Sequence, residues 1–174
     1  MKLKIVEYPD KRLKSKSVKV ENFDSNLHKL LDAMNPMMIN TNGIGLAAIQ
    51  VGVAQKILIL NIPDEDGEQP VENLIEMINP VISELKGEST YQEGCLSVPE
   101  FYEDINRYAT LHVNYQDREG NTKELQAEGL LSIAIQHEVD HLNGILFIDK
   151  LPSSKRRKFD KEYKKMLKEK KSSK

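Results

Sequence analysis

The sequence predicts an α+β fold in which short, mostly antiparallel strands lead into helices. Short runs of strand-forming residues separated by turns occupy the middle of the chain, and two helical segments follow them. Strands and helices do not alternate as the units of a parallel sheet would require. The length of 174 residues suits one domain with a core of its own.

The first expected element is a helix that begins after Asp24 or Ser25, either of which can cap its first turn. Pro36 should kink or end this helix, because proline lacks the backbone N–H that the helix needs. Apolar residues recur after the cap at helical spacing. These residues are Leu27, Leu30, Leu31, Met34 and Met38.

The centre of the chain predicts strands. The segment KILILNI is rich in strand formers, and two shorter apolar runs after it favour further strands. A later segment alternates apolar and polar residues, meets the turn sequence DREGN and continues as a second strand, which is typical of a hairpin. The expected strands cover residues 56–62, 74–80, 81–86, 110–116 and 122–127.

Two helices should close the chain. Residues 130–143 predict a helix that ends at Gly144, and a second helix is expected after Pro152. We expect residues 1–150 to form the main body and residues 151–174 to form a basic helix and tail of the same domain. The apolar stripe of the last helix comprises Phe159, Tyr163, Met166 and Leu167.

The composition, with 39% apolar and 30% charged residues, is ordinary for a globular protein. No stretch approaches the roughly 18 to 20 apolar residues of a membrane span. The basic amino terminus has no apolar run behind it, so no signal peptide is expected. A single cysteine cannot form an internal disulfide and suits a reducing compartment. We therefore expect a cytoplasmic protein that does not associate with membranes.

Charge is unevenly distributed along the chain. Residues 150–174 carry 12 Lys and Arg against 3 Asp and Glu, whereas residues 1–149 carry 13 against 24. This basic tail indicates either a polyanionic partner or a helix whose lysines simply face water.

The strongest local signal is the motif HEVDH at residues 137–141. On a helix, His137 and His141 lie one turn apart on the same face, so both imidazoles can reach one metal ion. Glu138 lies on the flank of that face, close enough to touch a water on the metal. The residues before the motif are apolar, and two unpaired histidines facing a buried space would be costly. We therefore interpret the histidines as metal ligands.

A catalytic metal site usually needs a third protein ligand and one open position. Glu162 follows His141 by 21 residues, but it lies among lysines on a helix that we expect to be solvated. Cys95 lies upstream beside Gly94, which permits close backbone approach, and before an expected turn at Pro99. A thiolate with two imidazoles suits zinc, iron(II), cobalt or nickel. The other two histidines, His28 and His112, are interpreted as structural or surface residues.

Three segments together resemble the motifs of the peptide deformylase family. They are residues 43–50 (GIGLAAIQ), 93–97 (EGCLS) and 137–141 (HEVDH), and their order and separation are specific to that family. The similarity runs from about residue 1 to about residue 170. It implies strands wrapped around a central helix that carries the HExxH motif. It also implies an enzyme of protein biosynthesis that hydrolyses the N-terminal formyl group from formyl-methionine of nascent polypeptides and releases formate.

The resemblance implies roles for individual residues. A metal-bound water would be the nucleophile, and Glu138 would act as general base and then acid. The side-chain amide of Gln50 and the backbone N–H of Leu96 would stabilise the oxyanion. The implied metal ligands are Cys95, His137 and His141.

The family's peptide lies extended against backbone, here that of Ile44, Gly45 and Gly94, and its Met side chain enters an apolar pocket. The implied substrate-binding residues are Ile44, Gly45, Tyr91, Glu93, Gly94, Leu130, Ile133 and Ala134, with His137 at the pocket's end. By the same resemblance the metal is iron(II) in the cell, with zinc, nickel or cobalt in purified protein. The basic tail would dock the enzyme, as a monomer, at the ribosome.

Tyr102 stands where many bacterial members of the family have Arg near the mouth of the cleft. Arg107 is expected either to pair with Asp140 or to lie on the surface. Two other functions remain as alternatives. One is an HExxH zinc peptidase with Glu162 as the third ligand, and the other is a structural-zinc module whose basic tail binds nucleic acid.

Overall fold

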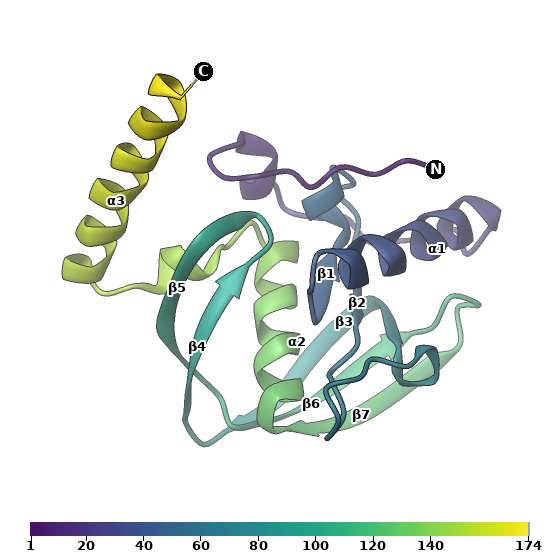
Figure 1. Ribbon diagram of the computed structural model, residues 1–174. Helices are drawn as coiled ribbons and strands as arrows, with labels where there is room; N and C mark the ends of the chain where they lie inside the picture. Colours follow the sequence, from purple (N-terminus) through teal and green to yellow (C-terminus); the bar gives the residue numbers. More distant parts are fainter. Residues whose placement is uncertain (174) are drawn as a thin grey trace.

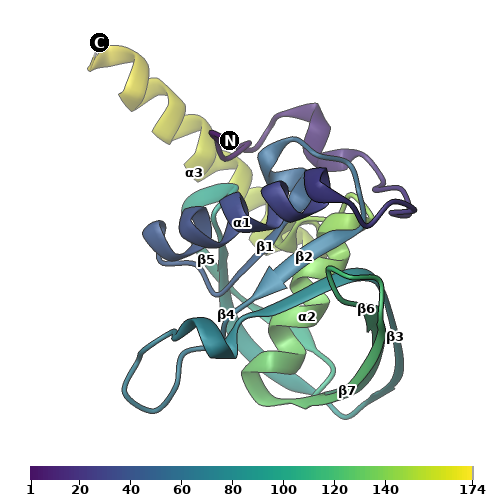
Figure 2. The same ribbon diagram turned by 90° about the vertical axis from the view of Figure 1, so that its right-hand side faces the viewer.

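The computed structural model describes residues 1–173 and confirms the α+β class (Figure 1). A five-stranded antiparallel sheet has the order β1-β2-β3-β6-β7, and β4 pairs with β5 separately. Helix α2 lies between the two sheets (Figures 1 and 2). The strands are β1 (Gly45–Ala47), β2 (Ile57–Leu60), β3 (Ile75–Lys86), β4 (Ser89–Cys95), β5 (Val98–Arg107), β6 (Thr110–Gln116) and β7 (Thr122–Glu128). The helices are α1 (Ser25–Asn40), α2 (Gly129–Leu142) and α3 (Ser153–Ser172).

Helix α1 begins as predicted, because the side chain of Asp24 caps it by accepting a hydrogen bond from the backbone N–H of Leu27. All five apolar residues predicted for its inner face are buried. Of the two effects predicted for Pro36, a kink or an end of the helix, the end is wrong, since α1 continues to Asn40. Pro36 and Asp32 are exposed, so water can satisfy the Asp32 carbonyl that proline leaves free.

The sheet differs from the prediction at β3. The two strands expected at residues 74–80 and 81–86 form one long strand with register shifts after Ile78 and after Ser83. Pro80 lies in the first irregular stretch, where it has no N–H to donate to the ladder. The bent strand therefore pairs with β2 through its first half and with β6 through its second half.

The hairpin of β6 and β7 is confirmed, and the side chain of Asp117 holds its turn by accepting from the backbone N–H groups of Glu119 and Asn121. Strands β1, β4 and β5 were not predicted. The expected turn at Pro99 is also misplaced, because Pro99 lies within β5 and the turn falls at residues 96–97.

Two layers of apolar side chains fix the position of α2. Its residues Ile135 and Leu142 pack with Leu58, Met77 and Val113 of the large sheet. Helix α1 covers part of the opposite face, so all four residues of β2 are fully buried. Each such side chain contributes about 1.5–3 kcal/mol when it is removed from water. The helix that carries the HExxH motif therefore has a rigid apolar support.

Helix α3 is attached to the body through its first half only. Phe159 is buried against Tyr8 and Phe101, and the hydroxyl of Tyr163 donates to the Tyr8 carbonyl at 3.1 Å. Leu167, the last residue of the apolar stripe in the sequence, is 39% exposed and does not share this packing. The second half of α3 projects from the body (Figures 1 and 2). No helix in residues 1–173 is long and apolar enough to cross a membrane.

This attachment makes a prediction about stability. Replacing Phe159 with Ala should lower the free energy of unfolding by about 3 kcal/mol, because it leaves a cavity in the aromatic cluster. Replacing Leu167 with Ala should cost less than about 0.5 kcal/mol, as is usual at exposed positions. Urea unfolding of both variants measures the difference, and equal losses would contradict the packing described for α3.

Candidate metal centre and active site

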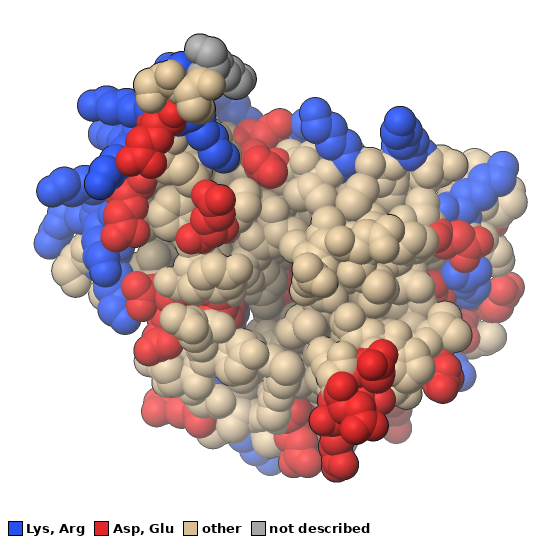
Figure 3. Space-filling model, viewed as in Figure 1, with Lys and Arg blue, Asp and Glu red and all other residues tan. Residues whose placement is uncertain are grey.

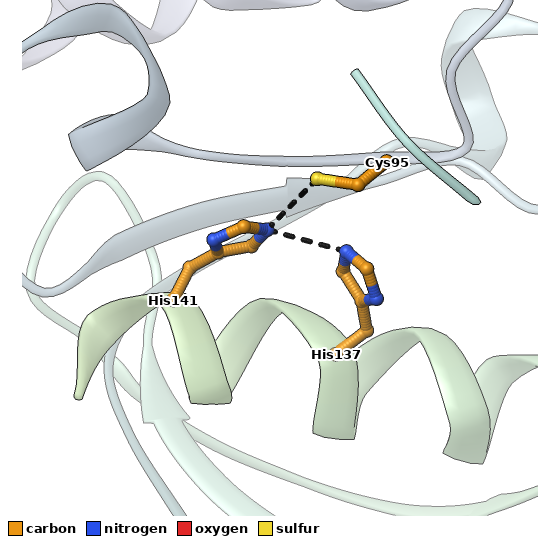
Figure 4. A group of neighbouring side chains, drawn as sticks. All are labelled: Cys95, His137 and His141. Atoms are coloured by element: carbon orange, nitrogen blue, oxygen red, sulfur yellow. Dashed lines mark hydrogen bonds between the residues drawn. The ribbon is translucent and has the colours of Figure 1, made fainter. Parts of the chain in front are cut away.

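Three side chains from two distant segments converge over α2 (Figure 4). The Nε2 atom of His141 lies 3.4 Å from the Sγ atom of Cys95 and 3.2 Å from the Nε2 atom of His137. All three ligand atoms lie within 4.8 Å of one another. Ligand atoms bound tetrahedrally to one ion at 2.0–2.3 Å stand roughly 3.3–3.8 Å apart. The spacing therefore fits one small divalent metal ion.

The local structure explains this convergence. The histidines lie one turn apart on α2, as their spacing predicts, and Cys95 ends β4 at the tight turn into β5. Glu162 is exposed on α3 beside Lys158 and does not join the group. The other two histidines lie away from this group, as expected for structural or surface residues. His28 contacts the Arg118 carbonyl, and His112 lies near the Glu124 carboxylate.

Each histidine is prepared for metal binding in a different way. Burial and the positive groups nearby lower the pKa of His141 well below its usual value, which favours the neutral imidazole that binds metals. The Nδ1 atom of His137 lies 2.8 Å from a carboxylate oxygen of Glu93. This contact turns the Nε2 atom of His137 toward Cys95 and His141.

Glu93 is held in turn by Arg107, whose side chain is 3% exposed. The guanidinium donates two hydrogen bonds of 2.8 Å to Glu93 and a third to Asp140 of α2. The pairing with Asp140 is thus present, and the surface alternative for Arg107 is wrong. Burial would raise the pKa of Glu93, but hydrogen bonds from Arg107 and His137 lower it. The contact of Glu93 with His137 could not be predicted from their positions in the sequence.

Glu138 is 3% exposed and faces the backbone of β1. A Cβ atom added to Gly45 would stand 2.6 Å from its Oε2 atom, so only glycine fits there. Burial raises the pKa of Glu138 to about 7. Its Oε1 atom has no hydrogen-bond partner in residues 1–173, which leaves it available to a molecule in the cavity. A carboxyl group with such a pKa can both accept and return a proton.

Gln50 is buried, and the hydrogen bonds of its side-chain amide fix the orientation of that amide. Its Oε1 atom accepts from the Ala47 backbone, while its Nε2 atom donates to Ser97 at 3.2 Å and points to Cys95 Sγ at 3.6 Å. This orientation places an amide N–H beside the metal ligands. Leu96, the other predicted donor, lines the same cavity.

The site opens into a cavity of about 520 Å³, visible as a hollow near the centre of the face in Figure 3. Tyr102, expected at the mouth of the cleft, also lines it and is 67% exposed. The Tyr102 ring covers Gly94, where an added Cβ would meet it at 2.5 Å. Every predicted substrate-binding residue lines this cavity, namely Ile44, Gly45, Tyr91, Glu93, Gly94, Leu130, Ile133 and Ala134.

An α+β fold that groups a cysteine sulfur and two imidazoles beside a buried carboxyl group, at the wall of an open cavity, defines a metal-dependent hydrolase. Comparison with known proteins agrees. The family model for polypeptide deformylase matches residues 2–157. A peptide deformylase of Helicobacter hepaticus is 54% identical over 168 residues, which is 96% of this chain and 93% of the relative. The chain belongs to the polypeptide deformylase family.

Solved structures share the fold. A peptide deformylase from Plasmodium falciparum superposes with a TM-score of 0.87 at 35% identity, covering 97% of this chain and 98% of that one. A class I type b peptide deformylase from Acinetobacter baumannii, with Met-Ala-Ser bound, has a TM-score of 0.80 at 32% identity. It covers 87% of this chain and 99% of its own.

The hydrogen bonds of Arg107 generate a prediction. Replacing Arg107 with Lys keeps the charge but loses the fork that holds Glu93, so His137 should lose its fixed orientation. We expect metal affinity to fall by about 10- to 100-fold, as is typical when the partner of a ligand is disturbed. Competition with a metal chelator measures this affinity. Arg157→Lys, at an exposed position of α3, is the matched control, and equal affinities of the two variants would contradict the role of Arg107.

Proposed function

We propose that this enzyme removes the formyl group from peptides that begin with N-formylmethionine. The observation that carries the proposal is one cavity lined by Cys95, His137, Glu138 and Gln50, with the third ligand atom, Nε2 of His141, buried directly behind Cys95 and His137. The Oε1 atom of Glu138 has no hydrogen-bond partner in the described residues. The Acinetobacter baumannii relative has a peptide beginning with Met bound. Such a peptide is the product expected of this reaction.

Cys95, His137 and His141 would hold a divalent ion, for which we propose iron(II) in the cell and zinc, nickel or cobalt after purification. When bound, such an ion lowers the pKa of a coordinated water and polarises the formyl carbonyl. The Oε1 atom of the buried Glu138 has no hydrogen-bond partner in the described residues, which supports binding of a water or a polar substrate group beside it.

Glu138 would move the protons. Its carboxylate accepts one proton as the water oxygen bonds to the formyl carbon, and it then gives that proton to the amide nitrogen as the carbon–nitrogen bond breaks. Formate and a free amino terminus result. With a pKa raised to about 7 by burial, Glu138 is suited to both transfers near neutral pH.

The negative oxygen of the tetrahedral intermediate needs donors. The Nε2 atom of Gln50 carries two hydrogens, of which one is directed to Ser97 and the other toward Cys95. The contact with Cys95 is long, at 3.6 Å, so this second hydrogen can also bind a substrate oxygen beside the sulfur. The backbone N–H of Leu96 is the second donor that we propose. Because Ala47 fixes the other end of the Gln50 amide, this donor is already in place before the reaction.

The peptide would lie between two free strand edges. Strand β1 pairs only with β2, and β4 pairs only with β5, so each keeps one edge unpaired among residues 1–173. Gly45 and Gly94 lie on these edges and line the cavity. Backbone hydrogen bonds to both edges would tolerate many sequences. The residues proposed to surround the Met side chain are Ile44, Tyr91, Leu130, Ile133 and Ala134.

The structure disfavours both alternatives. A peptidase with Glu162 as third ligand would need that residue near the histidines, but it lies exposed on α3. A structural zinc site would need a fourth ligand, whereas the group in the described part of the chain has three ligand residues, two of which, Cys95 and His137, line an open cavity. We propose that the enzyme acts as a monomer in the cytoplasm, where formylated chains begin.

Formate release from formyl-Met-Ala-Ser under anaerobic conditions, with metal analysis of the same sample, tests the proposal. Glu138→Gln should retain the fold and the metal but lose activity by about 10²- to 10⁴-fold, because an amide cannot accept the proton. Near-normal turnover by the metal-loaded variant would overturn the role of Glu138. A metal-loaded wild-type chain that releases no formate would overturn the function itself.

The basic helix α3 supports a second, independent proposal, that it docks the enzyme on the RNA of the ribosome. Lys and Arg side chains gather along α3 on the face shown in Figure 3. Phe159 and Tyr163 attach its first half to the body, so the lysines beyond Tyr163 are free to meet phosphates. If α3 only covered the body, this would explain why its first half packs there, but it would not explain the basic half that projects from the body.

Replacing Lys164, Lys165, Lys168, Lys170 and Lys171 with Gln should abolish salt-sensitive ribosome binding, because these residues neutralise phosphates. Turnover of short formyl-peptides should remain. Five exposed lysines of the body serve as the control set: Lys2, Lys16, Lys19, Lys29 and Lys123. Co-sedimentation with ribosomes at increasing salt measures binding. If both sets of variants lose ribosome binding equally, or if binding does not depend on salt, the proposal is wrong and α3 only covers the body of the protein.

A further inference from the structure

The loop between β2 and β3, at residues 61–74, is closed by two side-chain amides that the reaction does not use. The Nδ2 atom of Asn61 donates to the carbonyls of Gln69 and Pro70 at 3.2 and 3.0 Å. The Nε2 atom of Gln69 donates back to the Asn61 carbonyl at 2.7 Å. Asn61 is 1% exposed, and Gln69 is half-buried. These bonds tie the start of the loop to its end.

Gln69 makes one further contact, outside its own loop. Its Nε2 atom also donates to the carbonyl of Gly43, at 3.0 Å. Both partners of this nitrogen are carbonyl oxygens, which can only accept, so the orientation of the amide is fixed. Gly43 lies 26 residues away in sequence, in the segment that leads into β1 and lines the active-site cavity.

The segment before β1 is held at three points. The N–H of Gly43 donates to the Met38 carbonyl at 2.8 Å, and the carbonyl of Ile44 accepts from the N–H of Asn61 at 2.9 Å. Gln69 supplies the third bond. Backbone groups of successive residues in a strand point to opposite edges. Because Ile44 points to β2, Gly45 directs its N–H and carbonyl to the free edge that borders the cavity.

We propose that Gln69 is a positioning residue for substrate binding, which sets the free edge of β1 through the carbonyl of Gly43. The inference rests on the proposed function, since this edge is where the formyl-peptide would lie. Gln69 touches neither the metal ligands nor Glu138. Its loss should therefore weaken the binding of the peptide and leave the chemical step largely intact.

The test compares Gln69→Glu and Gln69→Ala with Gln126→Ala. Glutamate has the shape of glutamine, but its carboxylate cannot donate to the two carbonyls. Gln126 is exposed on β7, and its side-chain amide donates to exposed Glu84 far from the cavity, so it is the matched control. For formyl-Met-Ala-Ser we expect KM to rise about 3- to 10-fold in both Gln69 variants, with kcat within about twofold. Metal content should not change.

Hydrogen exchange supplies a readout that is independent of activity. The amides at residues 43–47 should exchange faster in both Gln69 variants, while those of α2 and β6 keep their rates. Unchanged exchange with an unchanged KM would overturn the proposal. Faster exchange throughout the chain, with kcat and KM both impaired, would also overturn it in favour of general destabilisation. If the wild-type chain releases no formate, the proposed function fails, and the exchange pattern alone decides whether Gln69 holds this edge.

Discussion

The geometry of the site depends on one buried interaction, the fork of hydrogen bonds that Arg107 makes to Glu93 and Asp140. The hairpin of β4 and β5 forms a sheet of its own, separate from the five-stranded sheet that supports α2. The position of Cys95 relative to the histidines is therefore set by side chains. Arg107 of β5 joins Glu93 of β4 to α2, and Glu93 orients His137. The cluster that joins the β4–β5 hairpin to α2 therefore also orients the proposed metal ligand His137.

A buried ion cluster of this kind is a poor source of stability, because removing the charges from water costs about as much as their attraction returns. Its value here lies in geometry. A guanidinium presents its donors in a rigid plane, so Glu93 and Asp140 can satisfy it in only one arrangement of hairpin and helix. Two glycines complete the constraint. Gly45 lets β1 approach Glu138, and Gly94 lets Tyr102 lie across β4. Together these contacts set the width of the cleft.

Local signals in the sequence predicted the parts of the protein whose causes are local. The caps and apolar spacing of α1, the hairpin of β6 and β7, and the pairing of two histidines on α2 all follow from neighbours within a few residues. Residue type made Cys95 a candidate for the third ligand, but only the resemblance to family motifs made the assignment specific, because nothing nearby in sequence brings Cys95 to α2. The partner of Arg107 depended on how the β4–β5 hairpin packs on α2, and spacing alone could not decide it. Strands β4 and β5 were missed because most of their residues are at least partly exposed and form no apolar run. The bend that unites β3 arises from its two different partners, β2 and β6.

The burial of the site suits the substrate that we propose. Glu138 is 3% exposed, and the charge of Arg107 is fully engaged by carboxylates, so the inner end of the cavity offers little hydration to a further charged group. A free amino terminus is largely charged at neutral pH, since its pKa is about 7.7–8.0. To enter a buried site it would have to lose its hydration, which is costly for an ion. A formylated terminus is a neutral amide and avoids that cost. Once the formyl group has gone, the new amine can take up a proton and is better solvated outside the cavity. The same burial that raises the pKa of Glu138 therefore favours entry of the neutral substrate and departure of the charged product.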